Sequence, residues 1–373
     1  MRLLREGYHE RLFLLTDERK GLIVRKEAKA ASSTLLAEIA WLEELPAALH
    51  RYFPRVLRSG KDQRGQAPFY DMPYFDHNWV LLSELILTQA LNQAGVLALI
   101  TQALQVMFRG IFPTTYPEEE PGYPDRMVSL LDYWVQRIAQ LPTFAPLLRA
   151  ETLCLNGAIL CNVLPLLERL KDEPHLREDR RPAAVRKVHG DLHPENILVR
   201  VPSLRRSVPQ VVLLDPIAAI GLSRGDFAMD IAKFRSWLSA ELLALRLGLF
   251  SVREERDHSP AFALTLHTSD TQLCALSDGA LLREFARLID TAGWARVVCD
   301  ADPQWQRRVS FYEALYALSM VPLVPFPQSL ARFLVGVRHL HNFVCDTSTQ
   351  HSAIGLGLTE GGRHGSLPLQ ADR

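Results

Sequence analysis

The chain has 373 residues, of which 48% are hydrophobic and 23% are charged, a composition typical of a globular protein with a substantial core. Its 42 basic and 42 acidic side chains cancel, which argues against the strongly charged surfaces of nucleic-acid-binding and membrane-surface proteins. Uninterrupted apolar runs are shorter than the roughly 18 to 20 residues of a membrane span, and the charged N-terminus lacks a signal-peptide core.

The first 75 residues predict a small lobe of strands with one helix. Two apolar runs, ERLFLLTD (10–17) and GLIVRKEA (21–28), flank a charged turn and predict a β-hairpin. The segment 32–45 starts with a serine and has Leu35, Ile39 and Leu42 at helical spacing, which predicts a capped amphipathic helix. Segments 53–60 and 67–75 predict two more strands. With a first strand of about five residues before the hairpin, we expect a five-stranded sheet.

From residue 76 to 345 the pattern is mostly helical. Segment 81–112 predicts two helices with a break near NQAG, and single helices are expected over 125–141, 150–171 and 226–247. The five cysteines include no CxxC pair. Cys154 and Cys161 would share one face of the helix expected over 150–171, as buried thiols rather than a zinc site. We therefore expect a reduced, cytoplasmic protein. Segment 252–278 is weakly patterned, and the tail 346–373 has no apolar period and is expected to be flexible.

A polar cluster interrupts the apolar pattern at VRKVHGDLHPENILVR (185–200). It places Asp191 and Asn196 five residues apart between strand-forming residues. Phosphoryl transfer needs a carboxylate to orient the attacking hydroxyl and oxygen ligands for Mg²⁺. Protein kinases supply both from an H-R-D-x-x-x-x-N loop, and this stretch has the same spacing with glycine in place of arginine. Asp215, at the end of the apolar run VVLLDP, matches the aspartate of the kinase D-F-G motif.

Taken together, HGDLHPENILV, VVLLDP and RGDFAMDIAKF resemble the aminoglycoside phosphotransferase and choline kinase group of protein-kinase-like small-molecule kinases. The resemblance is specific over residues 186–234 and extends in organisation over 1–345. It implies an α+β, protein-kinase-like, two-lobed fold. A small N-terminal β-sheet lobe with one helix (1–75) would bind the nucleotide, and a larger helical lobe (76–345) would carry the catalytic loop.

The resemblance also implies roles for the polar residues. Asp191 would be the catalytic carboxylate, and Asn196 and Asp215 would hold Mg²⁺. His189 would be architectural, and Asp230 would hold the catalytic loop by hydrogen bonds. Asp226 would cap the helix that follows it. His193 and Glu195 are left open, as loop-shaping or chemical residues.

The nucleotide side needs a cation on the third strand and a glutamate on the next helix. Lys26 is preferred because it shares a strand face with Val24, whereas the alternative, Arg25, points the other way. Glu38 is the expected helix partner. The adenine would pair with the backbone of the hinge at Pro73, Tyr74 and Phe75. The G-x-G-x-x-G phosphate loop of protein kinases is absent before residue 20, and only the turn at Gly7 could cover the phosphates.

These features predict an ATP-dependent phosphotransferase that acts on a hydroxyl of a small molecule such as a sugar, an amino alcohol or an antibiotic. Asp226 follows Asp215 by only eleven positions and no A-P-E motif is present, so a peptide-docking segment has no room. The acceptor would lie among the helices of 80–170 and 236–340. Residues that could line its pocket are Trp134, Trp237, Asp270, Asp278 and Trp294, although core packing is the commoner role of tryptophan.

Two alternative functions are a catalytically silent nucleotide-binding regulator of the same fold and a helical interaction protein. The oligomeric state is left open.

Overall fold

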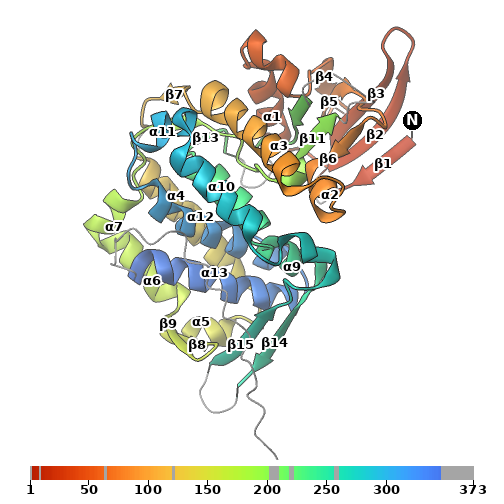
Figure 1. The fold of residues 1–373 in the computed structure, drawn as a ribbon. Coiled ribbons are helices and arrows are strands. Elements are labelled where there is room, and N and C mark those ends of the chain that lie inside the picture. The colour runs from red at the N-terminus through yellow and green to blue at the C-terminus, as the bar shows by residue number, and fades with distance from the viewer. Residues whose placement is uncertain are drawn as a thin grey trace, which may run out of the picture.

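An antiparallel sheet forms most of the N-terminal lobe in the computed structural model, which describes residues 2–7, 10–62, 65–119, 122–200, 210–217, 222–255 and 260–345. The strands run in the order β1-β2-β3-β5-β4 (Figure 1). Their bounds are Arg2–Glu6 for β1, Glu10–Asp17 for β2, Gly21–Ala28 for β3, Arg58–Lys61 for β4 and Pro68–Pro73 for β5. The expected five-stranded sheet is confirmed, although β4 is shorter than predicted because a 3₁₀ turn (Ala47–Tyr52) and Pro54 precede it.

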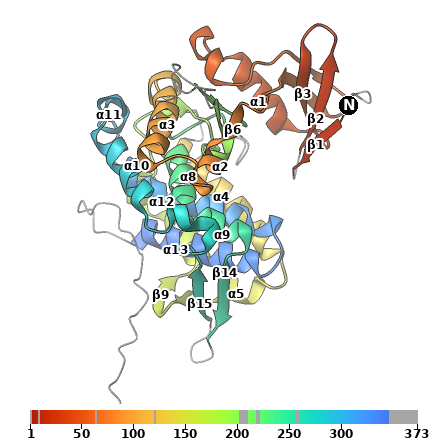
Figure 2. The ribbon, with the colours of Figure 1, turned by 45° about the vertical axis from the view of Figure 1, so that its right-hand side comes forward.

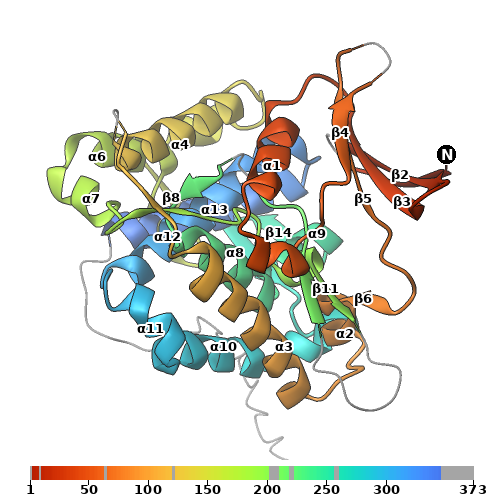
Figure 3. The same ribbon diagram turned by 90° about the horizontal axis from the view of Figure 1, so that it is seen from above.

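Helix α1 (Ser33–Glu43) packs against this sheet and faces the second lobe (Figure 3). The Ser32 hydroxyl accepts the backbone N–H of Leu35 at 3.1 Å, so the predicted cap is present. The apolar stripe with Leu35 and Ile39 is buried, and Glu38 lies on the same buried side of the helix. A carboxylate placed there needs a charged partner.

The C-terminal lobe is mainly helical and is built around α12 and α13, whose residues are largely buried (Figures 1 and 2). Its helices are α2 (Leu82–Leu87), α3 (Gln93–Val106), α4 (Tyr123–Ala139), α5 (Ala145–Arg149), α6 (Val163–Asp172), α7 (Pro174–Asp179), α8 (Ala228–Leu238), α9 (Glu241–Leu247), α10 (Ala280–Thr291), α11 (Gly293–Cys299), α12 (Trp305–Ser319) and α13 (Gln328–Cys345). Short 3₁₀ turns occupy Thr271–Leu276 and Val321–Leu323.

One apolar stretch in this lobe is long enough to cross a membrane. It comprises α3 and the π-helical turn Met107–Ile111 that continues it, and among the described residues no other helix meets that criterion. Half of this stretch is buried inside the protein, so it has the character of a core helix. The two helices expected over 81–112, with a break before Gln93, are confirmed as α2 and α3.

Two small sheets flank the polar cluster. Strand β10 (Val185–Lys187) leads into it and lies between β7 (Thr115–Tyr116) and β13 (Arg224–Gly225). Strand β11 (Ile197–Arg200) leads out of it and lies between β6 (Trp79–Leu81) and β12 (Gln210–Leu213). The segment between β11 and β12 lies outside the described residues. The cluster is thus anchored at both ends by antiparallel pairing.

The helix predicted over 150–171 is wrong in its first half. A hairpin of β8 (Thr152–Leu155) and β9 (Ala158–Cys161) precedes α6. Asn156 and Gly157 both have positive φ (53° and 81°), the conformation of a type I′ turn that Asn-Gly favours. Cys154 and Cys161 therefore lie on strands instead of on one helix face.

This hairpin belongs to a sheet that the weak patterning after residue 250 did not reveal. The order is β14-β15-β8-β9, with β14 at Phe250–Glu254 and β15 at Ala261–Leu266. It lies at the end of the lobe away from the N-terminal sheet (Figures 1 and 2). The single helix predicted over 226–247 is also divided, into α8 and α9, at Ala240, which has a positive φ of 62°. The predicted flexible tail, 346–373, lies outside the described residues.

Candidate active site

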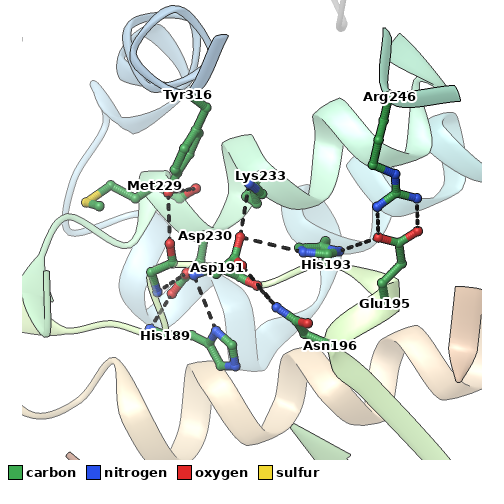
Figure 4. A network of polar contacts seen from close by, with 11 residues as sticks. His189, Asp191, His193, Glu195, Asn196, Met229, Asp230, Lys233, Arg246 and Tyr316 are labelled. Carbon is green, nitrogen blue, oxygen red and sulfur yellow. Dashed lines mark hydrogen bonds and ion pairs between the residues drawn. The ribbon is translucent and has the colours of Figure 1, made fainter. Parts of the chain in front are cut away.

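The loop between β10 and β11 is shaped by α8. Both oxygens of Asp230 accept backbone hydrogen bonds, from the N–H of His189 at 2.8 Å and of Gly190 at 2.7 Å (Figure 4). The expectation that Asp230 holds this loop is therefore confirmed. Burial raises the pKa of Asp230 to about 7, against the opposing effect of these N–H donors.

Three side chains contact the Asp191 carboxylate. Its Oδ1 lies 3.0 Å from Lys233 Nζ and 3.6 Å from His193 Nε2, and its Oδ2 accepts the Asn196 amide N–H at 3.1 Å (Figure 4). Burial acts to raise the pKa of Asp191, but Lys233 and His193 outweigh burial and hold that pKa well below its usual range. A fixed, ionised carboxylate thus stands at the position predicted for the catalytic residue.

Asn196 and Asp215 are brought together by the β11–β12 pairing. The N–H of Leu214 donates to the Asn196 carbonyl at 2.7 Å, so Asp215 follows directly beside Asn196. Asp215 has a positive φ of 52°, and Ile217 has one of 59°. Such values are rare outside glycine and concentrate at functional sites. The two proposed metal ligands therefore meet at one end of this small sheet.

Lys26 lies in the interface of the two lobes and is almost fully buried. Its Nζ lies 2.9 and 2.8 Å from the two carboxylate oxygens of Glu38 and 3.0 Å from Asp215 Oδ1. Burial opposes its charge, but Asp215 and Glu38 outweigh burial and raise the pKa of Lys26. The alternative, Arg25, lies on the other face of β3, where its guanidinium pairs with Asp71 at 2.8 Å. Lys26, Glu38 and Asp215 thus form one cluster that Arg25 does not join.

The three residues predicted to form the hinge lie between the sheet and the second lobe. Pro73 ends β5, pairing with Ile23 of β3. Tyr74 is exposed, and the Phe75 ring packs edge-on against Trp79, the first residue of β6. The chain passes here from β5 to β6, and the lobe boundary near residue 75 and the adenine contact of these residues stay predictions.

The two histidines of the loop, His189 and His193, and Glu195 contact other protein groups. His189 is fully buried, and burial lowers its pKa to about 4, so its ring is neutral at physiological pH and cannot act as a cation there. Glu195 forms a two-pronged ion pair with Arg246 of α9, and its Oε2 lies 3.8 Å from His193 Nδ1 (Figure 4). Glu195 therefore links the loop to α9.

Other residues considered from sequence have structural positions. Asp226 accepts the N–H of Ala228, the first residue of α8, and pairs with buried Arg308, although Phe227 and not Asp226 occupies the N-cap position. Of the five possible acceptor-lining residues, Trp237 is buried, Trp134 and Trp294 pack against the core, and Asp270 and Asp278 accept backbone N–H groups of their own loops.

Two charged residues at the site were not identified from the sequence. Lys233 lies three positions after Asp230, so the helical period alone puts both on one side of α8. That signal could have indicated Lys233. Arg246 carries no comparable signal, since its partner Glu195 is 51 positions away and on a different element.

Comparison with known protein families shows which family this sequence matches. The profile of the phosphotransferase enzyme family (APH) matches residues 1–247. The chain belongs to this phosphotransferase family. Among curated proteins, none matches the chain by sequence.

Solved structures share the fold at low sequence identity. A thermostable mutant of aminoglycoside phosphotransferase APH(4)-Ia, in a ternary complex with ADP and hygromycin B, has a TM-score of 0.52 and 13% identity, with 93% of this chain and 94% of that chain covered. The apo form of a thermostable mutant has a TM-score of 0.50, 12% identity and the same coverages. Choline kinase from Cryptosporidium parvum Iowa II has a TM-score of 0.43 and 9% identity, covering 92% and 87%. The two aminoglycoside phosphotransferase structures, together with the family match, confirm the expected α+β, protein-kinase-like fold.

Proposed function

We propose that this phosphotransferase is an ATP- and Mg²⁺-dependent kinase whose acceptor is a hydroxyl group of a small molecule. The observation that carries the proposal is the convergence of three ionised groups and one amide from separate segments. Lys26 comes from β3, Asp191 and Asn196 from the loop after β10, and Asp215 from the end of β12. Phosphoryl transfer requires positioning and charge stabilisation, and these residue types supply both.

The residues at the end of β11–β12 suit a divalent cation. The Asn196 amide nitrogen faces Asp191, and its amide oxygen points away (Figure 4). Asp215 adds a carboxylate held ionised by Lys26, which overrides burial and lowers the pKa of Asp215. Among the described residues no cluster of three or more His, Cys, Asp or Glu could hold a metal alone. Mg²⁺ commonly takes one or two protein ligands and completes its shell with phosphate oxygens and water, and when bound it would neutralise phosphate charge.

Each of the other residues has a defined part in this proposal. Lys26, oriented by Glu38, would donate to the α- and β-phosphates, and the backbone of Pro73, Tyr74 and Phe75 would contact the adenine edge. Asp191 would accept the hydrogen bond of the acceptor hydroxyl and hold its oxygen in line with the γ-phosphorus. The pKa of Asp191 lies below its ordinary value, which favours orientation of the hydroxyl over early proton removal.

The acceptor would bind on the C-terminal lobe beside α9. A surface hollow of about 390 Å³ lies there, lined by Arg246, Leu247, Gly248, Phe250 and residues 325–328. Arg246 connects the hollow to the catalytic loop through Glu195. A hollow of this size suits a small molecule, and the eleven positions from Asp215 to Asp226 leave little chain for docking a peptide.

Acceptor-dependent ADP release tests the proposal. The purified protein, with ATP and Mg²⁺, is screened against sugars, amino alcohols, and aminoglycoside and macrolide antibiotics, with peptides as the comparison class. We expect at least one small hydroxyl compound, and no peptide, to stimulate ADP release. Nucleotide binding without turnover on any compound would identify a silent regulator, and strong phosphorylation of a protein would refute the small-molecule assignment.

A further inference from the structure

Helix α8 directs two charged side chains at the catalytic loop. Asp230 and Lys233 are three positions apart and therefore lie on the same side of the helix. Asp230 accepts the backbone N–H groups of His189 and Gly190, and the Lys233 ammonium lies 3.0 Å from Asp191 Oδ1 (Figure 4). One holds the loop backbone and the other contacts the loop's central carboxylate.

The Lys233 side chain is enclosed, with 14% of its surface exposed. Its Nζ lies 4.8 Å from the centre of the Tyr316 ring, and the Tyr316 hydroxyl donates to the Gly190 carbonyl at 3.3 Å. A buried ammonium is unfavourable unless it is paired. Here the ring and the Asp191 carboxylate supply that pairing, so the ammonium has one well-defined location.

The contact constrains how the Asp191 carboxylate can turn. Lys233 occupies Oδ1, and the Asn196 amide occupies Oδ2 at 3.1 Å. With both oxygens engaged, rotation about the terminal carboxylate bond would break one of the two contacts. Oδ1 also faces His193 Nε2 at 3.6 Å. Each carboxylate oxygen has two lone pairs, so Oδ2, which accepts only the Asn196 amide N–H, retains capacity to accept a hydroxyl hydrogen.

We propose that Lys233 is a positioning residue that sets the orientation of the Asp191 carboxylate toward the acceptor hydroxyl. This inference depends on the proposed kinase function. Lys233 acts through Asp191, so its removal should affect the catalytic step far more than nucleotide binding. Misplacement of a reacting group by about 1 Å can lower turnover about 10²-fold.

The test compares Lys233→Ala and Lys233→Arg with a matched variant of the same helix. Arg235 Nε pairs with the buried Glu313 carboxylate at 3.2 Å, but on a different side of α8. Arg235→Ala therefore removes a cation from a buried carboxylate without touching the loop. For each protein, kcat, the KM values, the Kd for ATP with Mg²⁺ and the Tm are measured with the acceptor found by the screen. Wild-type turnover is established first, since its absence would be a failure of the proposed function itself.

We expect Lys233→Ala to lower kcat about 30- to 100-fold with the Kd for ATP changed less than about threefold. Lys233→Arg should restore a large part of kcat. Added ethylammonium, which can enter the partly exposed space left by the truncation, should raise kcat of Lys233→Ala but not of Arg235→Ala. Arg235→Ala should lower Tm and keep kcat.

A Lys233→Ala protein with unchanged kcat would overturn the inference. It would also be overturned if lost kcat were accompanied by a lower Tm and neither arginine nor ethylammonium restored activity, because that pattern belongs to a structural ion pair.

Discussion

Gly190 shows how the loop depends on one backbone conformation. Its φ is +77°, and a Cβ atom added there would lie 3.0 Å from the Leu222 carbonyl oxygen and 3.2 Å from the Ile217 Cα. Both neighbours are backbone atoms, which cannot move aside as a side chain end can. Where protein kinases have arginine in this motif, this chain requires a residue without a side chain.

Gly190→Ala should therefore destabilise the protein and impair the site together. We expect a loss of roughly 2 to 3 kcal/mol in the free energy of unfolding, from the positive φ and the close contacts, and a fall in turnover because the Asp215 segment must shift. Gly157→Ala is the matched control. Its φ is +81° but nothing lies within 4 Å of the added Cβ, so it should cost only about 1 kcal/mol and keep full turnover. Urea unfolding and ADP release measure both, and equal effects of the two substitutions would contradict the crowding argument.

Asp191→Asn keeps the shape of the side chain and removes its charge. Turnover should fall by roughly 10² to 10⁴, because the charged carboxylate that orients the acceptor hydroxyl is lost, while Mg²⁺-ATP affinity stays within a few-fold. Isothermal titration and ADP release measure the two quantities. A collapse of nucleotide affinity would instead make Asp191 structural or a metal ligand. Surviving turnover would move the role to His193, since Glu195 is already engaged by Arg246.

The sequence allowed the loop residues to be predicted because their spacing is local. Asp191 and Asn196 lie on one short loop, and Asp215 ends the paired strand. Strand alternation left Lys26 and Arg25 as alternatives, and only the tertiary fold shows that Lys26 turns toward Glu38. The contacts of Lys233 and Arg246 depend on where α8 and α9 pack, which periodicity does not specify.

At the scale of elements, the hairpin of β8 and β9 contradicts the helix predicted over 150–171. Its apolar residues fit a helical period, although Asn156-Gly157 between two short apolar runs is a strong hairpin signal. The parallel partner of β8 is β15, more than a hundred positions later. Such non-local pairing has no signature in a single sequence, whereas α1, with a local cap and local spacing, was predicted correctly.

Helix α9 is held at both ends by charged contacts. Arg246 near its C-terminus pairs with Glu195 of the loop between β10 and β11. Glu241 at its start lies 2.8 Å from His339 Nε2 and also pairs with Arg338, both on α13. Burial acts to raise the pKa of Glu241, but His339 and Arg338 outweigh it and hold the pKa well below its ordinary value. The position of Arg246, and so of the hollow beside it, depends on this attachment.

Because the pKa of Glu241 is lower in the folded than in the unfolded chain, its contribution to stability is present at neutral pH. It is lost as pH falls below the ordinary glutamate range, since the unfolded chain then binds a proton that the folded chain does not. Glu241→Gln should lower the free energy of unfolding by roughly 1.5 to 3 kcal/mol at pH 7. The difference from wild type should shrink as pH falls from 5 toward 3.

Urea unfolding between pH 7 and pH 3 measures this difference. Glu284→Gln is the control, because Glu284 pairs with Arg287 on the exposed side of α10, where such pairs contribute little. It should follow the wild-type pH dependence. A gap between Glu241→Gln and wild type that is the same at every pH would show that the carboxylate charge is not what attaches α9.

At the scale of the molecule, polar contacts join the two lobes in addition to the chain connection and the shared apolar core. Lys26 of the sheet reaches Asp215 of the second lobe, the Trp41 indole N–H donates to the Val188 carbonyl at 3.0 Å, and Lys187 Nζ lies 3.2 Å from the Trp41 carbonyl. The division into two lobes could be predicted from the change in periodicity near residue 75. The contacts between them could not, because they join residues more than a hundred positions apart.

Since the proposed nucleotide and metal ligands come from both lobes, Mg²⁺-ATP should stabilise the whole molecule. At 100 times its Kd, a ligand that binds only the folded state adds about 2.7 kcal/mol, which corresponds to a rise in Tm of roughly 3 to 4 °C for a chain of this length. ATP with EDTA should give a smaller rise, because Asn196 and Asp215 then contribute no metal bridge.

Asp215→Ala should lose the part of the rise in Tm that depends on Mg²⁺ and retain the part due to ATP alone. Asp132→Ala, which removes a surface carboxylate paired with Lys171, should respond to Mg²⁺ as wild type does. Thermal unfolding in ATP, in ATP with Mg²⁺ and in ATP with Mg²⁺ and EDTA separates these contributions. An Asp215→Ala protein with an undiminished Mg²⁺ response would place the metal elsewhere and remove the main support for Asp215 as its ligand.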